Sequence, residues 1–133
     1  MSENILAKLF EHNNWANENI IQVCLALRDE QLDAQPQSVT KGNIRETLIH
    51  LVSSQRGYLA LLMLPLEQRP TAPLAFPELL ESVHSSGKGL LALPSGDATF
   101  FDSRLTTRDE HYTEPWVVML QVINHATEHR EQI

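Results

Sequence analysis

The sequence has few of the residues that mark several common classes of protein. It has a single cysteine, Cys24, so it cannot form an intrachain disulfide, and a reducing cytoplasmic setting is expected. It has ten Lys and Arg against seventeen Asp and Glu. The basic residues are scattered, which argues against a nucleic acid as partner, because binding phosphates requires a basic face.

Long hydrophobic runs are also missing. The longest lies around residues 58–66 and is interrupted by Pro65, whereas a membrane-spanning helix needs about 20 apolar residues. The N-terminus has neither the basic segment nor the apolar segment of a secretory signal. The sequence therefore predicts a soluble, cytoplasmic protein with no membrane partner.

Apolar residues instead recur at helical spacing in four stretches. The predicted helices cover residues 2–27, 43–64, 77–93 and 113–133. Residues 28–42 are expected to form a connection with one short helical turn, residues 65–76 a surface linker, and residues 98–112 a loop or a short extended piece. This pattern predicts an all-α four-helix bundle that forms a single domain over residues 1–133. Two long connections leave the packing order of the helices open.

Local signals predict where these helices begin. Ser2 and Thr113 are expected to cap the first and fourth helices, and Asn43 with Glu46 resembles a capping box at the second. The predicted inward face of the first helix consists of Leu6, Leu9, Asn13, Ala16, Ile20, Val23 and Leu27. That of the third helix consists of Leu79, Leu80, Val83, Leu90 and Leu91.

Three histidines carry the strongest chemical signal. His125 and His129 are four residues apart, so their side chains lie about 6 Å apart on one helix face and are able to hold one cation. The pair continues an apolar stripe, which indicates that it faces inward. His50, in the middle of the second predicted helix, is the best candidate for a third ligand. Histidine pairs with this spacing also occur on exposed helix faces, where they are merely solvated.

Three segments resemble the DinB/YfiT-like superfamily of bacterial metal-binding four-helix bundles. They are NNWAN at residues 13–17, TLIHLV at 47–52 and NHATEHREQI at 124–133, of which the last is the most specific. The resemblance implies that His50, His125 and His129 are metal ligands and that the protein forms a homodimer. It also implies a link to transferases and isomerases that use bacillithiol, mycothiol or glutathione. Related chains usually continue past the last motif, so a C-terminal segment is expected to be missing.

Three neutral imidazoles leave at least one coordination position open, which is typical of catalytic zinc, and nickel is equally compatible. With the resemblance, this pattern favours a metal-dependent transferase that joins a low-molecular-weight thiol to a small electrophile. Two alternatives are a non-catalytic stress-response or interaction bundle with a structural metal, and a metal-dependent hydrolase.

Other motifs have simpler interpretations. Residues 125–129 also fit the H-x-x-E-H pattern of inverted zinc proteases, but Glu128 is expected to face solvent. A di-iron bundle needs two Glu-x-x-His motifs, and only Glu81 with His84 matches. Glu46, one turn before His50, is a candidate partner of that histidine, although a capping role is favoured. Surface positions are expected for His12, His84 and His111, and a core position for Cys24.

Overall fold

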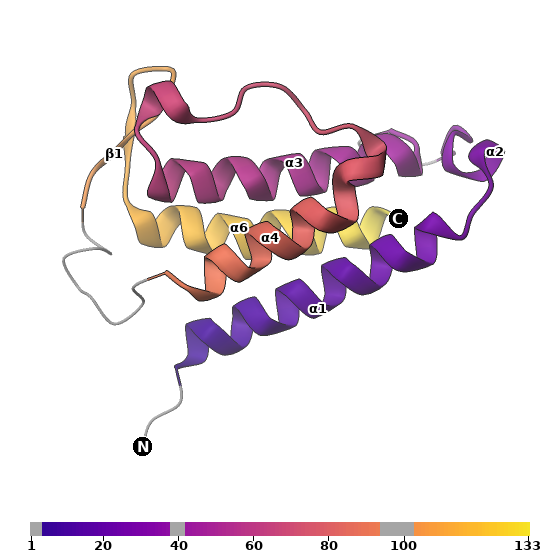
Figure 1. Ribbon diagram of the computed structural model, residues 1–133, viewed down its shortest axis with the longest axis horizontal. Helices are drawn as coiled ribbons and strands as arrows, with labels where there is room; N and C mark the ends of the chain where they lie inside the picture. Colours follow the sequence, from indigo (N-terminus) through magenta and orange to yellow (C-terminus); the bar gives the residue numbers. More distant parts are fainter. Residues whose placement is uncertain (1–3, 38–41, 94–102) are drawn as a thin grey trace.

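The computed structural model describes residues 4–37, 42–93 and 103–133, which are mostly helical (Figure 1). The long helices in these segments are α1 (Ile5–Leu25), α3 (Ile44–Met63), α4 (Leu79–Leu91) and α6 (Pro115–Gln132). The short elements are α2 (Asp29–Leu32), η1 (Leu66–Gln68), η2 (Phe76–Glu78), β1 (Leu105–Thr106) and β2 (Tyr112–Thr113). The predicted all-α bundle is confirmed. Within the described segments, every helix is too short or too polar to cross a lipid bilayer.

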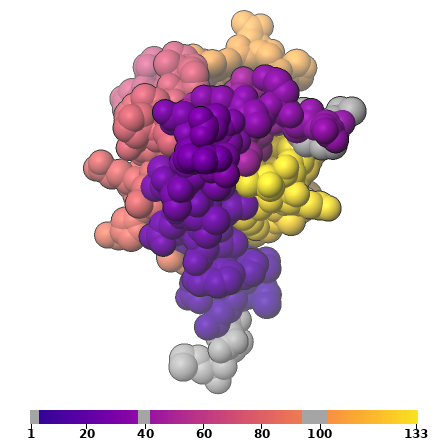
Figure 2. All heavy atoms as spheres, turned by 90° about the vertical axis from the view of Figure 1, so that its right-hand side faces the viewer, coloured from indigo at the N-terminus to yellow at the C-terminus, as the bar shows by residue number. Residues whose placement is uncertain are grey.

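The packing order of the helices is not the order of the chain. Both α1 and α3 pack most extensively against α4 and α6, so α1 lies diagonally opposite α3. Seen from the end of the bundle that carries α2, α1 lies between α4 on one side and α6 on the other (Figure 2). The chain therefore passes between diagonally opposite helices twice, from α1 to α3 and from α4 to α6.

Two of the connections contain the short elements that the sequence predicted. The short helical turn expected in residues 28–42 is α2, and the short extended piece is the antiparallel pair β1–β2, in which Leu105 faces Thr113. Residues 94–102, which include the start of the predicted loop over residues 98–112, lie outside the described residues. The linker before α4 is attached to α3, because the Leu74 N–H donates to Ser53 Oγ at 2.9 Å.

Two of the three predicted helix caps are replaced by neighbouring residues. The Asn4 side chain accepts hydrogen bonds at the start of α1, so the helix begins after Asn4, and Ser2 lies outside the described residues. Thr113 belongs to β2 instead of capping α6, and Glu114 is the extended residue before the helix. The reason is Pro115 at the first helical position, because proline disfavours a helical conformation in the residue before it.

The cap of α3 is close to the prediction. Asn43 Oδ1 accepts from the backbone N–H of Glu46 at 2.8 Å. The Glu46 carboxylate accepts from the side-chain amide of Asn43 at 3.4 Å, whereas a full capping box would use the backbone N–H of Asn43. Glu46 thus has the capping role that the sequence favoured.

The inward face of α1 differs from the prediction. Leu9 and Val23, both expected inside, are 43% and 67% exposed. Leu91 of α4, also expected inside, is 42% exposed. The buried side chains of α1 are Phe10, Asn13, Asn17, Ile21 and Cys24. An apolar periodicity cannot identify this face, because two of its central residues are asparagines.

A buried polar network connects all four long helices. Gln55 of α3 accepts from the amides of Asn13 and Asn17 of α1, at 3.0 and 3.2 Å, and donates to Ser86 Oγ of α4 at 2.9 Å. Arg130 of α6 donates to Asn17 Oδ1, and burial lowers the pKa of its guanidinium. This network lies between two apolar clusters, one around Leu51 and one around Met119, each with members from several helices.

We expect Gly57→Ala to stabilise the protein by about 0.5–1 kcal/mol, because alanine is the better helix former. Gly57 lies inside α3, and a Cβ added there would have no heavy atom within 4 Å. Urea denaturation measures the change. The matched comparison is Gly87→Ala, where the new Cβ would lie 2.8 Å from the Asn14 side chain. A destabilised Gly57→Ala variant would show that residue 57 has a close neighbour.

Candidate metal centre

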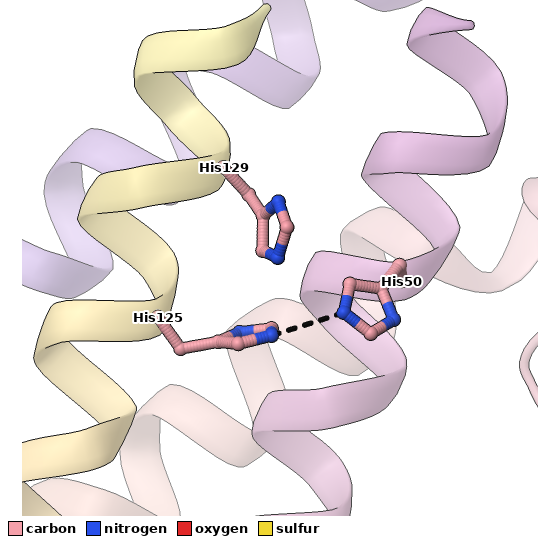
Figure 3. Close-up of side chains that lie close together, drawn as sticks. All are labelled: His50, His125 and His129. Carbon is pink, nitrogen blue, oxygen red and sulfur yellow. Dashed lines mark hydrogen bonds between the residues drawn. The ribbon is translucent and has the colours of Figure 1, made fainter. Parts of the chain in front are cut away.

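The three predicted ligand residues lie together in the structure. His50 projects from α3, and His125 and His129 project from successive turns of α6 toward it (Figure 3). Their potential ligand atoms all lie within 4.8 Å of one another. The Nε2 atoms of His50 and His125 are 3.0 Å apart. The imidazoles from the two helices therefore converge on one point.

The spacing of these imidazoles suits a single divalent ion. Zinc–nitrogen bonds of about 2.0–2.1 Å at tetrahedral angles place two ligand nitrogens roughly 3.3 Å apart. The closest pair of histidine nitrogens is already near this separation, and small rotations of the third ring would complete the set. Within the described residues, this is the one group of at least three His, Cys, Asp or Glu side chains arranged to hold a metal. A three-histidine set leaves room for an exogenous ligand.

Burial differs among the three rings. His129 is 7% exposed, whereas His50 and His125 are half-buried, so an external molecule is able to approach the cluster from their side. Tyr58 of α3 packs its ring edge against His125 at a centroid distance of 5.7 Å. Its hydroxyl accepts from Gln121 of α6 at 3.4 Å. The sequence pattern identifies Tyr58 only as part of the apolar stripe of its helix. That it lies beside the histidine cluster is seen only in the tertiary structure.

A comparison with protein-family models matches residues 1–133 to the DinB family. The chain belongs to the DinB family. The match agrees with the resemblance of the three sequence segments, including the histidine-bearing ends of α3 and α6. A search of curated proteins finds no match to this DinB protein.

The side chain of Gln132 supports the cluster, although sequence reasoning assigned it no role. Gln132 Oε1 lies 2.7 Å from His129 Nδ1, three residues earlier on α6. An amide oxygen only accepts, so this contact requires a proton on Nδ1 and leaves the lone pair on Nε2 for a metal. The spacing of three residues on a helix is the signal that predicts such a contact.

We expect Gln132→Ala to lower the affinity of this DinB protein for zinc by about 10–100-fold, as is typical when a hydrogen bond to a ligand histidine is lost. Competition with a chromophoric chelator measures the affinity. Glu131→Ala, an exposed neighbour on the same helix, is the control and should bind zinc as the wild type does. Equal affinities in the two variants would contradict the orienting role of Gln132.

The other residues considered as candidate site residues occupy core or surface positions, as expected. Burial raises the pKa of the Cys24 thiol, which fits a core residue better than a nucleophile. His84 is largely exposed and lies 2.7 Å from Glu18, so its pairing does not involve Glu81 or a second metal motif. The side chains that are exposed include His12, His111 and Glu128.

Proposed function

We propose that this DinB protein is a metal-dependent transferase that joins a low-molecular-weight thiol to a small electrophile. The observation that supports it most is the convergence of His50, His125 and His129 on one point. Zinc or nickel is the proposed ion, because imidazole nitrogens suit both. We further propose that the protein acts in the cytoplasm, where such thiols are abundant, and as a homodimer.

The described side chains suggest which residues would bind the ion and where the nucleophile would come from. A bound divalent ion would stabilise a thiolate at neutral pH and so supply the nucleophile. The three histidines would hold that ion, and Gln132 would keep His129 in the ligating tautomer. The single cysteine is buried, so the reacting sulfur must come from an external thiol. The thiol loses its proton, its sulfur forms a bond to the electrophilic carbon, and the leaving group departs with the bonding electrons.

The test is an assay of zinc-loaded and nickel-loaded protein with bacillithiol, mycothiol or glutathione and 1-chloro-2,4-dinitrobenzene. We expect metal-dependent turnover with at least one thiol, and its loss in His125→Ala. His12→Ala, an exposed histidine on α1, should retain full activity. Absence of turnover with all three thiols would contradict the proposal. Thiol-independent ester hydrolysis that disappears in His125→Ala would favour a hydrolase instead.

A further inference from the structure

A cavity separate from the histidine cluster lies between α3 and α4, away from the face of α3 that carries His50. Its volume is about 500 Å³, which is within the range of ligand sites. Apart from one arginine, its walls are apolar. The α3 side is formed by residues that include Leu59, Met63 and Leu64, and Pro70 and Ala92 contribute from the linker and the end of α4. We call this cavity the α3/α4 groove.

Among the residues that the structure describes, Arg56 is the only charged one that lines the groove. It is the first of the lining residues along α3, and the groove continues from it toward Leu64. Its Nη2 donates to the Ala72 carbonyl of the linker at 2.5 Å, which holds the guanidinium in place. Its Nε is buried without a hydrogen-bond partner. Among the described residues, no carboxylate lies within ion-pair distance of Arg56, so its charge is not balanced by the protein.

The other charges near the groove are of both signs. Arg69 and Arg108, beyond its Leu64 end, donate to backbone carbonyls and form no ion pair with a described carboxylate. Glu78 and Glu81 line a separate hollow on the other side of Arg56. The Glu78 carboxylate accepts from the Ala75 N–H. Of these three arginines, only Arg56 lines the groove itself, whereas Arg69 and Arg108 are held by backbone carbonyls at or beyond its Leu64 end.

From this arrangement we propose that the α3/α4 groove binds a fatty-acid anion, with the carboxylate on Arg56 and the aliphatic tail along the groove. The apolar walls match a tail that has no polar groups, and a guanidinium binds a carboxylate through paired hydrogen bonds. The apolar walls run from Arg56 toward Leu64, so the tail extends in that direction. This site is separate from the histidine cluster and does not depend on the proposed transferase activity.

The first test is calorimetric titration of the metal-loaded protein with decanoate below its micelle concentration. We expect saturable binding of one decanoate per chain, weakened roughly 10–100-fold in Arg56→Gln, the effect of losing a charged hydrogen-bond pair. Arg28→Gln is the control, because it removes the same charge from a residue paired with Glu30 on α2. Absence of saturable binding, or equal affinity in Arg56→Gln, would overturn the proposal.

Further experiments distinguish the contribution of the tail from that of the head group. They also distinguish binding in the groove from binding at the metal centre. Met63→Glu places a charge on an exposed wall of the groove without disturbing the core, and should abolish decanoate binding. Decyltrimethylammonium, which has the same tail and the opposite charge, should not bind. His125→Ala should bind decanoate as the wild type does, and loss of binding there would assign the ligand to the metal centre.

Discussion

His50→Ala should lower the affinity for zinc by more than about 100-fold. Loss of an outer hydrogen bond to a ligand typically costs about 10–100-fold, and loss of a ligand itself should cost more. Without His50, the ion would be held only by His125 and His129, both on α6. Elemental analysis after dialysis, together with chelator competition, measures this effect. His12→Ala removes an exposed histidine and should leave the zinc content unchanged.

Thermal unfolding provides a second readout of the same prediction. A ligand that binds only the folded state at 100 times its Kd stabilises that state by about 2.7 kcal/mol. Zinc should therefore raise the Tm of the wild type and leave that of His50→Ala nearly unchanged. If His50→Ala retained the wild-type zinc content and Tm shift, residue 50 would not be a ligand, and the metal would lie elsewhere.

Gln55→Ala should lower the free energy of unfolding by about 3–5 kcal/mol. The truncation leaves the amides of Asn13 and Asn17 and the hydroxyl of Ser86 without this partner inside the bundle, and each unsatisfied group costs about 1–3 kcal/mol. The cavity that remains adds to the loss. Urea denaturation measures the effect. Gln22→Ala, on the exposed face of α1, should change the stability by less than about 0.5 kcal/mol.

Gln55→Met separates the contribution of the hydrogen bonds to stability from that of side-chain packing. Methionine has nearly the same length and volume as glutamine, so it leaves little cavity but provides no comparable donor or acceptor. We expect Gln55→Met to remain destabilised by about 2 kcal/mol or more, since the neighbouring polar groups are still buried. A variant as stable as the wild type would show that the polar network contributes nothing to stability.

Sequence periodicity predicted the long helices and the all-α class, but it left the packing order of the helices open. Residues four apart on a helix share a face, so His125 and His129 were paired without knowledge of the tertiary structure. His50 was the best candidate for the third ligand because it lies within the second predicted helix, and the resemblance of residues 47–52 to the family implied the same role. The family match over residues 1–133 agrees with the resemblance of the same segments.

The features that the sequence did not predict depend on partners in other helices. Asn17, which was not expected inside, is buried with its amide donating to Gln55, and Asn13, which was expected inside, donates to the same acceptor. The role of Arg56 depends in the same way on α4 and on the linker, which form the other walls of its groove. A single sequence contains the periodicity of each helix but not the pairing between helices.

X-ray absorption spectroscopy of the zinc-loaded protein tests the metal centre most directly. We expect one ion per chain, with imidazole scattering from three nitrogens at about 2.0–2.1 Å and at least one oxygen ligand from solvent. His50→Ala should show one imidazole fewer at any site that still holds zinc. A spectrum with only oxygen ligands, or an unchanged imidazole count in the variant, would contradict a centre formed by His50, His125 and His129.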